Sequence, residues 1–210
     1  MRDVVIRESK ILFHLPTLWP TMTRDEAYLI LTDLVKNKNL IKHHLACEAA
    51  MKAIYKRISA KPTPEEETNW ALVGLLHDAD YELCRDHPEK HTLVLEEKIG
   101  FKIDSRLMYA IKSHNFAYTG FQPKSYMDWG IYCCDELTGL IIAAALVHPE
   151  KKIAPLTVEF IMNRFNSPSF AKGANREQIK MCEQELGIPL DEFVGIVLNS
   201  MQEIAVDLKL

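Results

Sequence analysis

Residues 71–80 read ALVGLLHDAD, a run of six small or apolar residues followed by a histidine–aspartate pair and a polar continuation. The apolar run predicts a helix segment buried on all sides. The polar residues between Asp78 and Pro88 predict that this helix ends near the pair. The predicted end matters because adjacent residues inside a helix point about 100° apart. His77 and Asp78 can therefore share one ligand only from the end of a helix.

Helix signals recur on both sides of this stretch, whereas alternating strand patterns longer than a few residues are absent. Capping-box or proline-start signals precede two of the apolar stripes. The predicted helices cover residues 23–35, 39–59 (capped by Asn39), 63–77, 88–100, 104–114 (capped by Asp104) and 126–148, with a loop at 116–125 and about three more helices broken at 168, 173 and 187–189. We therefore expect an all-α fold.

Composition limits the classes of function. The chain has 210 residues, 48% of them hydrophobic, and a net charge of −4, so no bulk positive charge points to a nucleic acid polymer or to an anionic membrane. The longest apolar stretch, 137–147, is shorter than a membrane span and predicts a buried helix. The odd number of cysteines, five, fits a reducing compartment, and we expect a cytoplasmic protein.

Polar residues on otherwise apolar helix faces suggest a metal site. His43 shares a helix face with Leu40, Cys47 and Ala50, and Asp135 stands inside another apolar helix. A buried aspartate costs several kcal/mol unless it is paired or binds a cation. His43 points where these core residues point, so the helix register favours it over its neighbour His44. His44 is expected at the surface or in a cap.

Two imidazoles and two carboxylates make a mixed nitrogen and oxygen donor set. Such a set suits a divalent transition metal, Mn, Fe, Co, Ni or Zn, with Mg also admissible, and is less suited to Ca. His43, His77, Asp78 and Asp135 are the four predicted ligands. Four protein ligands leave open positions in an octahedral shell, where water or a phosphate oxygen can bind.

The order His43, then Leu-Leu-His77-Asp78, then Asp135 resembles the HD superfamily of metal-dependent phosphohydrolases over residues 39–147. The resemblance implies an HD-domain helical bundle of the HDIG-like, uncharacterised type. We expect an N-terminal extension, the HD core and C-terminal helices packed on that core, at residues 1–22, 23–150 and 151–210. No Ile-Gly-Lys continuation and no GYP motif follow the pair, which disfavours the cyclic-dinucleotide branch.

Superfamily members with two metals carry two further histidines between the HD pair and the last aspartate. His91 and His114 occupy that interval. The resemblance therefore implies one or two ions, with Asp78 as the bridge if two are present. The alternative role for His91 and His114, contact with substrate beside a single ion, stays open.

The implied reaction is hydrolysis of a phosphoester of a small metabolite or nucleotide by metal-activated water. Asp80 and Glu82, just after the pair, are the candidate catalytic acids or bases. Lys112, Arg85 and Lys90 are the candidate phosphate-binding residues. Two alternatives remain: a di-iron oxygenase of the HD type, and a non-catalytic, nucleotide-binding regulatory module. The sequence makes no prediction of oligomeric state.

Overall fold

The computed structural model describes residues 22–210, and it assigns helices and turns but no strand to them. The helices, in chain order, are α1 (Arg24–Leu34), α2 (Lys38–Ile58), α3 (Pro64–Leu76), the 3-10 helix η1 (Pro88–Lys90), α4 (Leu93–Ile99), α5 (Ser105–His114), α6 (Phe116–Thr119), α7 (Tyr126–Val147), α8 (Val158–Phe165), α9 (Arg176–Glu185), α10 (Leu190–Glu203) and α11 (Ala205–Leu208). The predicted all-α fold is confirmed. The predicted extension lies outside the described residues, apart from Met22.

Three local predictions need correction. The N-cap of α2 is Asn37, whose side chain accepts the Asn39 N–H, so the helix starts earlier than predicted. The helix predicted over 88–100 is broken at Thr92, which has a left-handed φ of 75°, and only α4 and the short η1 remain. The loop predicted between α5 and α7 contains the single-turn helix α6.

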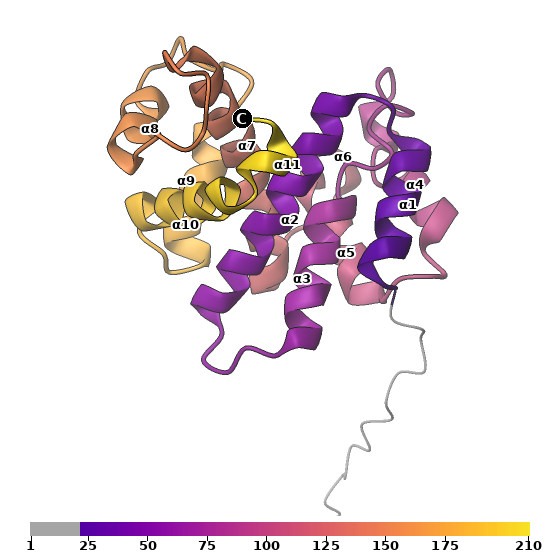
Figure 1. The fold of residues 1–210 in the computed structure, drawn as a ribbon. Coiled ribbons are helices and arrows are strands. Elements are labelled where there is room, and N and C mark those ends of the chain that lie inside the picture. Colours follow the sequence, from indigo (N-terminus) through magenta and orange to yellow (C-terminus); the bar gives the residue numbers. More distant parts are fainter. Residues whose placement is uncertain (1–21) are drawn as a thin grey trace, which may run out of the picture.

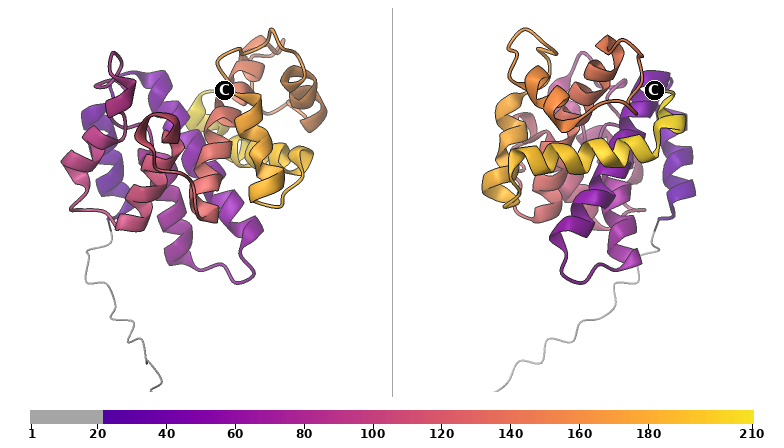
Figure 2. Two further views of the ribbon diagram at one scale, coloured as in Figure 1. Left: turned by 180° about the vertical axis from the view of Figure 1, so that it is seen from behind. Right: turned by 60° about the vertical axis from the view of Figure 1, so that its left-hand side comes forward.

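Helices α2 and α7 pack together at the centre of the bundle. Helix α3 packs on α2 and helix α5 on α7, whereas α10 and α9 cover α2 and α7 from the C-terminal half of the chain. Figures 1 and 2 show this division, with the orange and yellow C-terminal helices gathered on one side. The buried apolar residues form one cluster that runs from Met22 to Leu208. The C-terminal helices therefore share the core of the ligand-bearing helices.

A glycine sets the close approach of α3 to α2. A side chain at Gly74 would overlap the backbone of Cys47, so only glycine permits this contact. His43 lies one turn before Cys47, and His77 lies three residues after Gly74. The close contact therefore brings these two predicted ligands together.

Helix α7 is the most apolar helix of the chain. By length and composition alone it could cross a membrane, and 56% of its most apolar window is buried inside the fold. Buried core helices of soluble proteins share this property. The packing of α7 against α2, α5 and α9 gives it the role of a core helix in this structure.

Candidate metal centre

The six side chains predicted as ligands lie together where α2, α3, α5 and α7 meet. They come from the second turn of α2 (His43), the end of α3 (His77 and Asp78), the link between η1 and α4 (His91), the last residue of α5 (His114) and the middle of α7 (Asp135). As predicted, α3 ends at Leu76, which leaves His77 as its C-cap. The helix end lets both members of the pair face the same space.

Four of these side chains form a first group. The Nε2 atom of His43 lies 3.2 Å from Nε2 of His77 and 3.0 Å from Oδ1 of Asp135. The Oδ2 atom of Asp78 lies 3.8 Å from the His43 nitrogen and 3.7 Å from the His77 nitrogen. Ligands that bind a transition metal at about 2.1 Å and at right angles are about 3.0 Å apart. The group can therefore hold one ion after a small contraction.

The remaining side chains form a second group around the other oxygen of Asp78. Its Oδ1 lies 3.0 Å from Nε2 of His91 and 3.2 Å from Nε2 of His114, and these two nitrogens are 3.1 Å apart. Each oxygen of Asp78 thus faces a different group. Each oxygen of Asp78 can therefore serve as a ligand to a different group.

The outer nitrogen of each histidine ring is held by an oxygen atom. Nδ1 of His77 donates to the Gly74 carbonyl at 2.9 Å, and Nδ1 of His114 donates to the Ile111 carbonyl. Nδ1 of His91 donates to Oδ1 of Asp80 at 2.7 Å. Hydrogen bonds of this kind fix the tautomer and the orientation of metal-ligating imidazoles.

The fourth ring is held by a hydroxyl group. The Thr138 hydroxyl donates to the Asp135 carbonyl at 2.8 Å, so its oxygen is free to accept from Nδ1 of His43 at 3.1 Å. All four rings then turn an Nε2 atom toward the centre, in two pairs 3.1–3.2 Å apart. Facing lone pairs repel unless a proton or a metal ion lies between them. The donor set therefore fits a cation in each group.

The pKa values of the histidines and aspartates in the cluster also favour positive charge there. Burial opposes protonation of His77, but the carboxylates of Asp78 and Asp135 outweigh it and raise its pKa to about 9. Burial likewise opposes protonation of His91, and hydrogen bonds to Asp78 and Asp80 raise its pKa to about 10. Burial alone would raise the pKa of Asp135, yet hydrogen bonds from His43 and His77 lower it far below its usual range. The cluster thus attracts positive charge.

Cys47, expected only as a core residue, lies beside the first group: His43, Cys47, His77 and Asp135 are close enough together to hold one ion, as are His77, Asp78 and His114. Its sulfur lies 3.4 Å from Oγ1 of Thr138 and 3.9 Å from the ring nitrogens of His43. Burial, together with a hydrogen bond to Cys134, raises the pKa of the Cys47 thiol well above its usual value. Cys47 therefore packs as a neutral thiol against the His43 ring.

The two predicted catalytic acids make other contacts. Asp80 is fully buried, and besides His91 it accepts the backbone N–H groups of Thr92 and Leu95. Glu82 accepts the backbone N–H groups that follow Val35, at 2.7 and 3.1 Å, and so ties its loop to the start of α2. Both carboxylates are occupied by these bonds. Asp80 orients His91, and Glu82 joins its own loop to the segment before α2.

The three predicted phosphate-binding cations are dispersed. Lys112 is buried, with Nζ 2.6 Å from the Glu96 carboxylate and 4.1 Å from the centre of the Phe121 ring. Arg85 is exposed in the turn before η1, and Lys90 is exposed at the end of η1. None of the three lies among the residues that line the hollow beside the ligands.

The prediction that His44 is a surface or capping residue was wrong. Its side chain is fully buried, and neither ring nitrogen has a hydrogen-bond partner within residues 22–210. Burial, with repulsion from His77, lowers the pKa of His44 well below its usual value. Its ring packs 5.2 Å from that of His77, as a neutral neighbour. The helix period of α2 did not indicate the burial of His44, which depends on the packing of α3 against α2.

A hollow of about 260 Å³ opens beside the first group of ligands. It is lined by His43, Asp135, Glu136, Gly139, Ala171, Gly173 and Ala174. The side chains of His43, Asp78 and Asp135 keep 13–19% of their surface exposed. The first group is therefore reachable from solvent, whereas His77 is fully enclosed.

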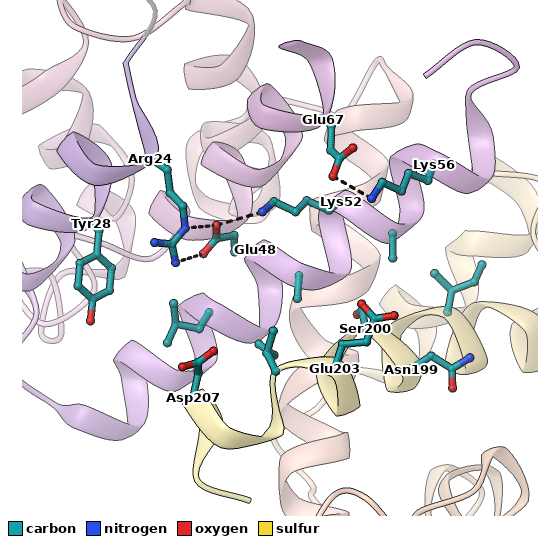
Figure 3. A pocket seen from close by; sticks show the side chains of 15 residues that line it. Arg24, Tyr28, Glu48, Lys52, Lys56, Glu67, Asn199, Ser200, Glu203 and Asp207 are labelled. Atoms are coloured by element: carbon teal, nitrogen blue, oxygen red, sulfur yellow. Dashed lines mark hydrogen bonds and ion pairs between the residues drawn. The ribbon is translucent and has the colours of Figure 1, made fainter. Parts of the chain in front are cut away.

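A larger hollow of about 870 Å³ lies against another face of α2, between α1 and α10. Figure 3 shows its charged lining, in which Arg24 forms a two-bonded ion pair with the buried Glu48 and Lys52 lies beside them. None of the six predicted ligands lines this hollow. Its charges are largely paired with one another, and it contributes nothing to the metal centre.

Comparison with known proteins gave no match: no family model, no curated protein and no solved structure is similar to this chain. The geometry of the cluster is therefore the main guide to function.

Proposed function

We propose that this chain is a metal-dependent phosphohydrolase of the HD type. The observation that carries the proposal is the bridging position of Asp78, with one oxygen toward His43 and His77 and the other toward His91 and His114. Together with Asp135, these side chains reproduce the order and the ligand types that the resemblance to the HD superfamily implies. Two divalent ions, such as Mn, Fe, Co, Ni or Zn, suit the mixed donor set.

The protein groups hold the reacting parts in place. Two bound cations would supply a nucleophilic water near neutral pH and positive charge against the phosphoryl oxygens. Asp78 fixes the separation of the two groups of ligands, and Asp80 and Thr138 fix the ring orientations of His91 and His43. The exposed edge of the first group admits a small phosphorylated substrate, whereas the enclosed histidines keep bulk water from the other side.

The test is hydrolysis of a panel of phosphoesters by purified protein supplied in turn with Mn, Co, Ni and Mg. Asp78→Ala should abolish turnover and lower the metal content, because it removes a ligand from both groups. Asp86→Ala, an exposed acid in the loop after the pair, is the matched control and should behave as the unmodified protein. Failure to cleave any phosphoester with any of these metals would refute the proposal.

The same six ligands favour a second candidate, a di-iron oxygenase. A pair of iron ions would supply dioxygen activation, and nitrogen-rich ligation by four histidines suits iron as well as other transition metals. Iron-dependent oxygen consumption in the presence of a candidate substrate, without phosphate release, would select this function. Phosphate release by the protein loaded with Mn or Ni, in the absence of iron and oxygen, would exclude it.

A further inference from the structure

Gly139 occupies a position in α7 that no packing constraint explains. It lies one turn after the ligand Asp135, is exposed, and has an ordinary helical backbone. A methyl group added to it would meet no atom of residues 22–210 within 4 Å, in contrast to Gly74 and Gly130, where it would collide with neighbours. Glycine weakens a helix relative to alanine. Glycine at position 139 thus leaves this space open and makes α7 less stable than alanine would.

That space is the hollow beside the first group of ligands. Gly139 lines it together with His43 and Asp135, and the loop between α8 and α9 supplies the opposite wall through Ala171, Gly173 and Ala174. Every lining residue other than the two ligands and Glu136 is glycine or alanine. Small side chains on both walls leave room directly next to the metal ligands.

The loop wall is held firmly. The guanidinium of Arg176 donates to the carbonyl of Phe165 at the end of α8 and to three carbonyls of the loop, those of Phe170, Ala171 and Ala174. The backbone N–H of Asn175 donates to Oε2 of Glu136 at 3.0 Å, which joins the loop to α7. These bonds keep the loop at a fixed distance from Gly139. The hollow is therefore an open depression whose far wall is held in place by the Arg176 and Glu136 bonds.

We propose that the hollow over Gly139 receives the alcohol part of the substrate, and that this alcohol is small, non-aromatic and carries an O–H or N–H donor. The inference rests on the proposed phosphohydrolase function and deepens it. In the reaction, a water oxygen forms a new bond to phosphorus, the bond from phosphorus to the alcohol oxygen breaks, and a proton from water leaves with the alcohol.

Three features of the lining define this substrate class. The volume of about 260 Å³ lies below the range of about 300–1,000 Å³ of pockets for drug-sized ligands. The only ring that lines the hollow is that of the candidate ligand His43, so no Phe, Tyr or Trp side chain there offers a nucleobase a surface for stacking. Glu136 accepts a single hydrogen bond from the described residues, at Oε2, which leaves Oε1 to accept a donor from the substrate.

Filling the hollow tests the inference. Gly139→Ala and Gly139→Leu should each raise the melting temperature, by about 2–4 °C if the helix gains the usual advantage over glycine. The Leu variant should raise the KM for glycerol 3-phosphate or phosphoethanolamine roughly 10- to 100-fold. Metal content and competitive inhibition by inorganic phosphate should stay unchanged, because neither depends on the alcohol site.

The matched control is Gly195→Ala in α10, a helix without a predicted ligand, where an added methyl group makes an ordinary contact with Val158. It should leave the KM unchanged. The unmodified protein should prefer the small esters to nucleoside 5′-monophosphates.

Three results would overturn the inference alone: preference for nucleoside monophosphates, an unchanged KM in Gly139→Leu, or lower melting temperatures for both Gly139 variants, which would reveal a packing role. Absence of hydrolysis of every phosphoester, with both ions bound, would instead overturn the proposed function and this inference with it.

Discussion

Replacement of Asp80 by asparagine separates a positioning role from a catalytic one. Its buried carboxylate accepts four hydrogen bonds, from Nδ1 of His91 at 2.7 Å, from the Thr92 N–H at 2.9 and 3.1 Å, and from the Leu95 N–H at 2.8 Å. Asparagine keeps the shape but loses the charge and turns an amide N–H₂ toward one of these donors. Asp80→Asn therefore weakens every bond in this set.

The expected magnitudes follow from those bonds. A hydrogen bond to a charged group contributes about 1.5–3 kcal/mol, and the asparagine oxygen retains part of this, so we expect a loss of about 2–4 kcal/mol in the free energy of unfolding. Loss of a carboxylate behind a metal-ligating histidine typically weakens metal binding about 10- to 100-fold. The weakening should affect the ion held by His91 and His114. The ion held by His43, His77 and Asp135 should keep its affinity.

Metal titration by calorimetry, with metal analysis after dialysis, measures both affinities. Urea unfolding of the metal-free protein measures the stability change. Asp86→Asn, an exposed acid of the same loop, is the control. Unchanged affinity of Asp80→Asn for both ions, together with a loss of turnover by orders of magnitude, would exclude a purely positioning role. That result would restore Asp80 to the catalytic role that the sequence suggested.

Three further outcomes are expected. Gly74→Ala should lower the free energy of unfolding by about 1–3 kcal/mol in urea titrations, because the new methyl group overlaps the Cys47 backbone; unchanged stability would contradict the close helix contact. Metal binding at pH 7 should release protons, measured by calorimetry in buffers of different ionisation enthalpy, because the pKa of about 9 for His77 and of about 10 for His91 keeps both charged without metal. Metal affinity should therefore weaken as the pH falls. The contribution of the two charged histidines to the stability of the metal-free protein should be present in full below about pH 6.5 and should be lost as the pH rises to 9–10. Metal binding that releases no proton would argue against these charged histidines. Glu48→Gln should cost about 1–2 kcal/mol in thermal unfolding, since its two-bonded partner in α1 is half exposed and partly screened; no change would show that the pair is incidental.

The sequence predicted four of the candidate ligands because each interrupts an apolar pattern, whereas His91 and His114 followed only from the resemblance to the HD superfamily. His43 and Asp135 stand on core-facing helix positions, and His77 and Asp78 stand where an apolar run meets polar residues. Patterns of this kind depend on helix period alone, which local sequence reports well. The structure brings all six predicted side chains together without a change of register.

The contacts of the neighbouring polar residues could not be predicted from the sequence, for a physical reason. Asp80 orients His91 only because Thr92 adopts a left-handed backbone and turns its N–H toward the carboxylate. No local pattern announces that turn. Glu82 bonds to backbone groups 45 and 46 positions earlier, and such long-range pairing depends on tertiary packing rather than on spacing. The burial of His44 and the position of the α8–α9 loop beside Gly139 also depend on tertiary packing, so the sequence did not predict them.

A centre of two ions that share Asp78 can be tested by diffraction at the absorption edge of the bound metal, because anomalous peaks count the ions and locate them. We expect two peaks, one beside His43, His77 and Asp135 and one beside His91 and His114, with Asp78 between them. A single peak at the first group, with His91 and His114 bound only to each other and to Asp80, would contradict it.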